Sequence, residues 1–203
     1  YSGSVTELVP PWDANMALAF HRYWCAVDAA VLAEFVNVST QYNVPLCMTE
    51  SGENSSDWFY GMKELLEANQ IGWCWWGVKK VDSTSAAFSA AITEDYQYVI
   101  DNFRDSPIDA VRAKAGLMQM AANLASDSCD FDPGCLDALL SSGFGSGDGL
   151  AFAALTVPGT INAVDYNIGA DGTAYADAES RNESGAPGGA AWNLGYLYRN
   201  DGV

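Results

Sequence analysis

The sequence predicts an α/β fold built on short parallel strands, and three observations support this prediction. Short apolar runs alternate with segments of helical periodicity, in the order β-α-β-α-β-α. The second run is apolar on both faces, as strands of a parallel sheet usually are. The chain has 203 residues, of which 49% are hydrophobic and 17% charged, which is typical of a packed globular protein.

The alternating segment extends from about residue 12 to residue 103. Its predicted elements are strands at residues 16–23, 44–50 and 71–76 and helices at residues 24–41, 56–69 and 93–103. In the first of these helices, Val27, Val31 and Phe35 fall on one face. Right-handed crossovers would join the strands into one parallel sheet. A further helix, rich in Ala and Met, is predicted at residues 108–125.

The composition changes in the second half of the chain and indicates a second domain. A Gly- and Ser-rich stretch breaks the helical pattern at residues 141–149. From about residue 155, Gly, Ala, Asn and Asp surround short β-like runs such as residues 160–166. We therefore divide the chain into an α/β part at residues 1–140, a linker at 141–154 and an all-β part at 155–203.

The charge of the chain excludes several classes of partner. Its formal net charge is -17 and its pI is about 4.1, whereas binding to nucleic acid or to an anionic membrane surface needs basic clusters. No stretch approaches the ~20 consecutive apolar residues of a membrane span. A neutral polymer such as a polysaccharide remains compatible with this charge.

Five cysteines are present, and their surroundings differ. Cys25, Cys47 and Cys74 lie in apolar, strand-like segments and are expected to be buried. Strict alternation along the strands would place Cys47 and Cys74 on opposite faces of the sheet, which argues against a disulfide between them. Cys129 and Cys135 flank a polar loop and could form a disulfide in an oxidising compartment, or remain free thiols.

Polar and aromatic side chains gather at the carboxyl ends of the predicted strands. His21 and Tyr23 end the first strand, Glu50 ends the second and Trp76 ends the third. Strict alternation would put Glu50 on the same face as Met48. Active sites of parallel α/β barrels are built at this end of the strands, so these four residues are the candidate site.

This set of side chains is suited to sugar chemistry. A retaining glycosidase uses one carboxylate as nucleophile and a second as acid/base, about 5–5.5 Å apart. The Tyr23 hydroxyl could orient Glu50, His21 could donate a hydrogen bond to a sugar hydroxyl, and the Trp76 indole offers a flat face to a pyranose ring.

Three motifs carry a resemblance to a known family. They are FHRYW at residues 20–24, VPLCMTESGEN at 44–54 and IGWCWWGVKK at 71–80. In this order they resemble the sixth, seventh and eighth strand motifs of glycoside hydrolase family five, which contains cellulases and endoglucanases on a (β/α)8 TIM barrel. The resemblance covers roughly residues 12–125.

The resemblance implies a role for each residue at the strand ends. Glu50 would be the nucleophile of a retaining endo-β-1,4-glucanase, His21 and Tyr23 would bind substrate, and Trp76 would stack on it. The acid/base glutamate of the family follows the fourth strand, so the chain is expected to be an incomplete TIM barrel that contains strands six to eight. Alone it should be inactive and prone to self-association. The family also implies secretion and a β-glucan partner.

The tail carries a second resemblance. The segments VPGTINAVDY at residues 157–166, residues 172–177 and AWNLGYLYRNDGV at 191–203 are similar to the start of a family six carbohydrate-binding module, a β-sandwich. Two glutamates near the start of such modules help to hold calcium, but Asn162 and Val164 stand at those positions here. No cofactor is therefore expected, with calcium in the module left as an alternative.

Alternatives remain for the nucleophile and for the function. Glu53 is the rival of Glu50, although its place before the predicted helix at residues 56–69 also suits an interaction with the helix N-terminus. His21, the one histidine of the chain, and Tyr23 could instead be structural residues. As a whole, the protein could bind extracellular polysaccharide without cutting it, or serve as a structural linker.

Overall fold

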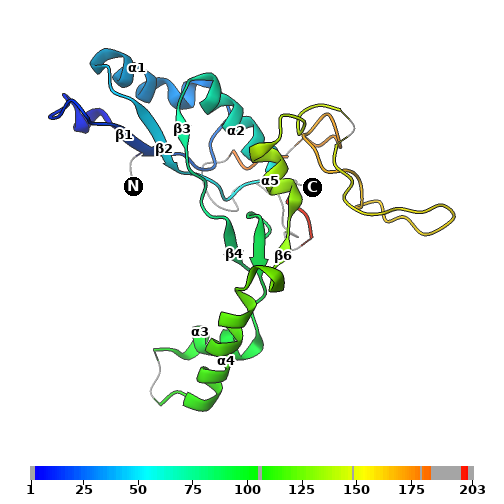
Figure 1. Cartoon of the computed structure of the whole chain (residues 1–203). Helices are drawn as coiled ribbons and strands as arrows, with labels where there is room; N and C mark the ends of the chain where they lie inside the picture. Colours follow the sequence, from blue (N-terminus) through cyan, green and yellow to red (C-terminus); the bar gives the residue numbers. More distant parts are fainter. Residues whose placement is uncertain (1–2, 105–106, 148, 179, 184–197, 201–203) are drawn as a thin grey trace.

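The computed structural model describes residues 3–104, 107–147, 149–178, 180–183 and 198–200. These residues form a mixed α/β structure with two small three-stranded sheets, one of them parallel (Figure 1). Neither a closed barrel nor a sandwich is found among them. The sequence analysis expected part of a TIM barrel followed by part of a sandwich. The structure agrees with the α/β class of this expectation only.

The first sheet carries the predicted β-α-β-α-β order. Strands β1 (Leu18–His21), β2 (Leu46–Glu50) and β3 (Gly72–Trp73) lie side by side in that order and are parallel. The connections contain a 3-10 helix (Ala29–Leu32), α1 (Ala33–Tyr42) and α2 (Ser56–Ala68). The sequence therefore predicted the strand order and both helices.

One face of this sheet is buried and the other is open. Phe20 of β1 stacks on Phe35 of α1 with ring centroids 4.1 Å apart, and Met48 of β2 is fully buried in the same apolar cluster. Residues Ala19, Thr49, Gly72 and Cys74 are all exposed. The two helices thus cover a single face, and the residues of β1 and β2 alternate between core and solvent.

The second sheet and the remaining helices follow in the chain. Strands β4 (Lys79–Val81) and β5 (Phe88–Ala90) are parallel, and β6 (Asp130–Phe131) is antiparallel to β5. Between β5 and β6 the chain forms a helical hairpin of α3 (Glu94–Asn102) and α4 (Ala110–Asn123) that projects away from the sheets (Figure 1). Arg112 joins the two helices through Asp95 at 2.7 Å and Glu94 at 2.9 Å.

The first predicted helix begins later than expected. The sequence predicts helix from residue 24, but α1 and the 3-10 turn before it start after Asp28, whose carboxylate accepts hydrogen bonds from the N–H groups of Ala30 and Val31. Trp24 has a left-handed backbone with φ 48°, which a helix cannot contain. The capping aspartate therefore determines the start of this helix.

The polar loop between the last two cysteines is partly helical. Helix α5 (Pro133–Leu140) begins there, with Asp132 as N-cap and Pro133 in the first turn, and packs against α2. Cys135 is buried within α5, whereas the Cys129 thiol donates to the carbonyl oxygens of Asn123 and Ala125. Both cysteines are free, so the disulfide considered from the sequence is not formed.

The described part of the tail packs on the start of α2. No strand forms at residues 160–166, contrary to prediction. Instead, Asn54 exchanges hydrogen bonds with the backbone of Asn182, and the Ser56 N–H donates to the carbonyl oxygen of Asn200. The Asp57 carboxylate pairs with Arg181 at 2.5 Å. Polar contacts, rather than a β-sandwich, hold this segment.

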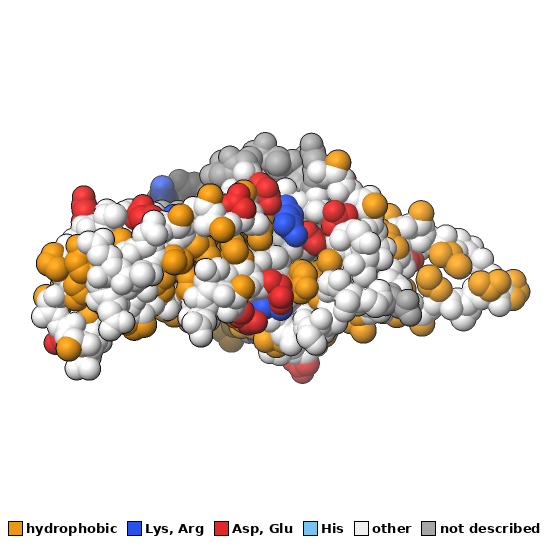
Figure 2. Space-filling model, turned by 90° about the horizontal axis from the view of Figure 1, so that it is seen from above, with side chains coloured by type: hydrophobic (Ala, Val, Ile, Leu, Met, Phe, Trp, Pro, Cys, Tyr) orange, Lys and Arg blue, Asp and Glu red, His pale blue; other side chains and the backbone are white. Residues whose placement is uncertain are grey.

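Apolar side chains are exposed over much of the surface. Figure 2 shows them on both sides of a group of acidic side chains that surrounds a few Lys and Arg residues. The α3–α4 hairpin contributes Phe103, Val111 and Met118 to the exposed set. No helix among the described residues is both long enough and apolar enough to cross a membrane.

We expect Asp57→Ala to lower the free energy of unfolding by about 2–3 kcal/mol. The Asp57 carboxylate is buried and also accepts from the Asp171 N–H at 2.9 Å, so its loss leaves several donors unpaired. The Arg181 side chain is 31% exposed, and water will compensate part of the loss. Urea unfolding measures the change.

Glu183→Ala is the matched control. Glu183 is a surface residue, and its Oε1 lies 4.0 Å from Nη1 of the same arginine. Its loss should change the free energy of unfolding by less than about 0.5 kcal/mol. Equal effects of the two substitutions would show that the buried carboxylate does not hold the tail.

Candidate active site

Three of the four predicted site residues meet at the ends of β1 and β2. The Tyr23 hydroxyl donates a hydrogen bond to Glu50 Oε1 at 2.8 Å, and His21 Nδ1 lies 3.7 Å from Glu50 Oε2. The Glu50 side chain is 32% exposed and that of His21 17%, so the carboxylate is held between a phenol and an imidazole but remains open to solvent. The sequence therefore predicted this cluster.

A β-bulge brings Glu50 to this face, which strict alternation had not predicted. Phe20 pairs with Met48 but His21 pairs with Glu50, so Thr49 is an extra residue in β2. In a regular strand, Glu50 would share the buried face of Met48. Because of the extra residue, Glu50 shares the open face with His21 instead, as bulges commonly re-aim a side chain beside a functional site.

The segment after β2 is fixed by contacts from three directions. Ser51 is fully buried, and its hydroxyl donates to the Arg22 carbonyl oxygen at 2.8 Å. The indole N–H of Trp24 donates to the Glu53 carbonyl oxygen at 3.0 Å. The Trp76 N–H donates to the Ser51 carbonyl oxygen at 2.7 Å. The backbone next to Glu50 is thus tied to the ends of both neighbouring strands.

Trp76 lies beyond the end of its strand. The prediction extended the strand through residue 76, but β3 ends at Trp73 and Trp76 forms an isolated bridge with Gly52. The Trp76 side chain is largely exposed, whereas Trp75 packs against Phe59 with ring centroids 5.1 Å apart. Trp75 therefore serves packing, and Trp76 presents its ring to solvent.

Glu53, the rival nucleophile, has a different partner. Its carboxylate lies 3.6 Å from Lys80 Nζ, and its backbone has φ 55°. Burial lowers the pKa of Lys80, and the neighbouring Glu53 carboxylate opposes this effect. Lys80 also donates to the Ser85 hydroxyl at 3.2 Å, so it is a largely buried structural cation. Glu53 therefore neutralises Lys80.

Trp24, Ser51 and Lys80 support the site, but sequence reasoning did not single them out as site residues. The indole N–H of Trp24 needs an acceptor, and the Glu53 carbonyl oxygen supplies it. The serine and glycine that follow Glu50 were a usable signal, because a buried hydroxyl and a positive φ are common where a strand turns sharply.

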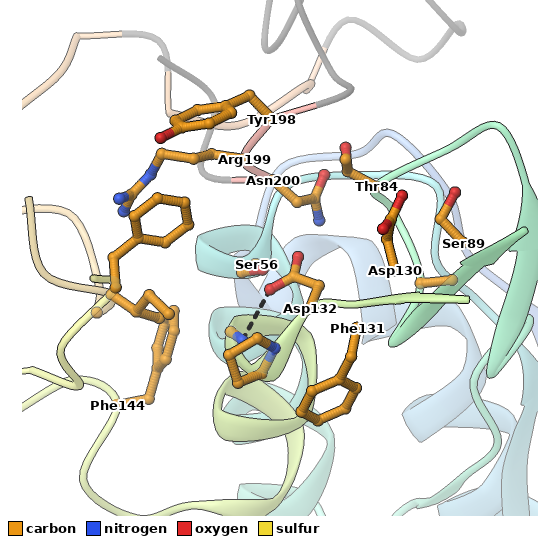
Figure 3. A pocket seen from close by; sticks show the side chains of 16 residues that line it. Ser56, Thr84, Ser89, Asp130, Phe131, Asp132, Phe144, Tyr198, Arg199 and Asn200 are labelled. Carbon is orange, nitrogen blue, oxygen red and sulfur yellow. Dashed lines mark hydrogen bonds between the residues drawn. The ribbon is translucent and has the colours of Figure 1, made fainter. Parts of the chain in front are cut away.

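A separate cavity of about 310 Å³ lies away from Glu50, between the starts of α2 and α5, the second sheet and residues 198–200 (Figure 3). None of the four predicted site residues lines it. Arg199, on its wall, stacks on Phe152 and Tyr166 and donates to the Tyr166 carbonyl oxygen at 2.6 Å. Asn200 Nδ2 donates to the Asn54 carbonyl oxygen at 2.9 Å. These side chains hold the tail in place.

The cluster at Glu50 has the properties of an oriented nucleophile or a sugar-binding carboxylate. One carboxylate oxygen accepts the hydrogen bond from Tyr23, the other lies 3.7 Å from His21 Nδ1, and an exposed indole is joined to the same loop. Within the described residues, no group of three or more His, Cys, Asp or Glu side chains is arranged to hold a metal ion.

Comparisons with protein family models, with curated proteins and with solved structures found no match to this chain. Its function therefore has to be inferred from its own residues.

We expect Gly52→Ala to lower the free energy of unfolding by about 2 kcal/mol or more, because Gly52 has φ 138° and a Cβ there would lie 2.3 Å from the Trp76 carbonyl oxygen. Gly72→Ala is the control, since its Cβ would meet Cys47 Sγ at an ordinary 3.7 Å. Urea unfolding of both variants measures the two free energies of unfolding. Equal stability of the variants would contradict the close contact between Gly52 and the Trp76 carbonyl oxygen.

Proposed function

We propose that this chain carries the nucleophile side of a retaining glycoside hydrolase that acts on β-1,4-linked glucans. The proposal combines the resemblance of the three strand motifs to glycoside hydrolase family five with the arrangement at the strand ends. In this proposal, the first sheet corresponds to strands six to eight of a TIM barrel. Residues 155–203 correspond to the start of a carbohydrate-binding module, and the protein is secreted.

The observation that carries the proposal is the hydrogen bond from Tyr23 to Glu50 Oε1 at 2.8 Å. A nucleophilic carboxylate must stay ionised and point one oxygen at the anomeric carbon. The phenol donates to one oxygen of the carboxylate and so restrains its rotation. The second oxygen, Oε2, lies 3.7 Å from His21 Nδ1, and the Glu50 side chain is 32% exposed.

In the proposed reaction, Glu50 forms a bond to the anomeric carbon while the bond to the leaving oxygen breaks. His21 donates a hydrogen bond to a sugar hydroxyl, and Trp76 stacks on the apolar face of a pyranose. The proton for the leaving group comes from an acid/base carboxylate outside these 203 residues. Water then releases the sugar from Glu50 with retention of configuration.

A mechanism-based label tests the role of Glu50 without the acid/base residue. The probe is a cellobioside with a dinitrophenyl leaving group and with fluorine in place of the hydroxyl next to the anomeric carbon. Dinitrophenolate departs with the bonding electron pair and needs no proton, and the fluorine slows hydrolysis of the glycosyl-enzyme. We expect intact mass spectrometry to show one added fluorocellobiosyl group, and peptide mapping to locate it on Glu50.

Two variants distinguish the candidate nucleophiles. Glu50→Gln should abolish labelling, and Glu53→Gln should be labelled at the wild-type rate. Labelling at Glu53, or no labelling of the wild-type chain, would overturn the proposal. Cellobiose binding without labelling would favour the alternative of a polysaccharide-binding protein that does not cut its ligand.

Tyr23→Phe should slow labelling about tenfold to a hundredfold, since a hydrogen bond to a charged group contributes about 1.5–3 kcal/mol. The ring packing beside Trp24 is retained in this variant, so its stability should change little. Rates are compared from the loss of unlabelled mass with time. A wild-type rate in Tyr23→Phe would show that the phenol does not orient the nucleophile.

A further inference from the structure

Two thiols lie together on the open face of the parallel sheet. Cys47 of β2 pairs with Gly72 of β3, and Cys74 follows two residues after Gly72 on the same side. The sequence had placed Cys47 and Cys74 on opposite faces and predicted both to be buried. That expectation is wrong. It assumed regular alternation between Cys47 and Glu50, which would put them on opposite faces, but the bulge at Thr49 puts both on the open face.

The sheet register places the two thiols near each other, since Cys47 Sγ lies over Gly72 and Cys74 is two residues further along β3's direction on the same face. Burial raises the pKa of Cys47, and the neighbouring Cys74 thiol acts in the same direction. Cys74 is exposed and Cys47 half-buried, and both are free thiols. Neither belongs to the apolar cluster beneath the sheet, so no packed side chain of that cluster separates them.

We propose that Cys47 and Cys74 form an oxidation site that closes to a reversible disulfide between β2 and β3. The oxidant is a low-molecular-weight disulfide such as oxidised glutathione. The exposed Cys74 thiolate attacks one of its sulfurs, which forms a mixed disulfide and releases one glutathione thiol. The Cys47 thiol then loses its proton to water and attacks Cys74 Sγ, which forms the protein disulfide and releases the second glutathione.

The backbone geometry indicates that this disulfide is labile. Cys74 is offset from Cys47 by about 6.6 Å along the parallel strands and by about 4.8 Å across them, so their Cα atoms lie roughly 8 Å apart, beyond the usual limit of about 6.8 Å for a disulfide. Strand β3 ends at Trp73, and the Cys74 N–H donates to the Met48 carbonyl oxygen at 2.8 Å. Closure therefore requires a small movement at the end of a short strand, and the resulting strain favours reduction.

The disulfide would act on the candidate site through the backbone. Cys47 precedes Glu50 by three residues and Cys74 precedes Trp76 by two. A covalent link between these strands would fix the two segments that carry the carboxylate and the exposed indole relative to each other. The oxidation site itself does not depend on the glycosidase proposal, because its formation is measured on the thiols.

The experiment incubates the reduced chain with oxidised glutathione, quenches it with acid and alkylates it under denaturing conditions. We expect a species lighter than the reduced chain by two hydrogen atoms, a linked peptide pair containing Cys47 and Cys74, and full alkylation of the other three cysteines. Dithiothreitol should restore alkylation of both. Alkylation of Cys47 and Cys74 after oxidation, or a linkage between other cysteines, would overturn the proposal.

Two variants test the order of attack. Cys47→Ser should stop at the mixed disulfide of Cys74 with glutathione, whereas Cys129→Ser, which removes a thiol outside the pair, should form the linked peptides as the wild type does. A persistent mixed disulfide on Cys74 in the wild type would show that Cys47 cannot reach it, and would also overturn the proposal.

Discussion

The arrangement of the candidate site depends on one extra residue in β2. This strand must bury Met48 beneath the helices and yet end with a carboxylate on the opposite face. A regular strand cannot do both, because residues two apart share a face. Without the bulge at Thr49, Glu50 would point into the apolar core, where an unpaired carboxylate is very costly. Cys47 comes before the bulge and already lies on the open face by alternation with Met48, so the bulge puts Glu50 on the same face as Cys47.

Sequence patterns predicted the strands and helices of the first sheet better than they predicted its bulge or helix α5. The spacing of Val31 and Phe35 and the apolar run before Glu50 were enough to predict the parallel order of the first sheet, because periodicity reports which face is buried. The bulge left no such signal, since one inserted residue inside an apolar run does not change its composition. The position of Glu50 beside Tyr23 was nevertheless predicted, because strand ends converge whatever the register. Helix α5 was missed although Asp132 and Pro133 are a usual start signal, since the flanking cysteines favoured a loop.

The N-terminal end of α2 connects the candidate site with the tail. The turn that follows Glu50 leads directly into Asn54, Ser55 and Asp57, which are all buried and bond to residues 180–182. These contacts are polar, and each satisfies a group that would otherwise be buried without a partner. The tail segment therefore contributes to the environment of the turn beside the carboxylate, although it lies more than a hundred residues further along the chain.

The α3–α4 hairpin leaves the second sheet and returns to it at neighbouring positions, since Ser89 of β5 pairs with Asp130 of β6. Its two helices are joined to each other through Arg112 and contact the rest of the structure mainly near its base. Over evolutionary time, such a hairpin can be lengthened, shortened or exchanged between related proteins without altering the path of the chain on either side. Variation in this region is therefore expected to be decoupled from selection on the strand ends that carry Glu50.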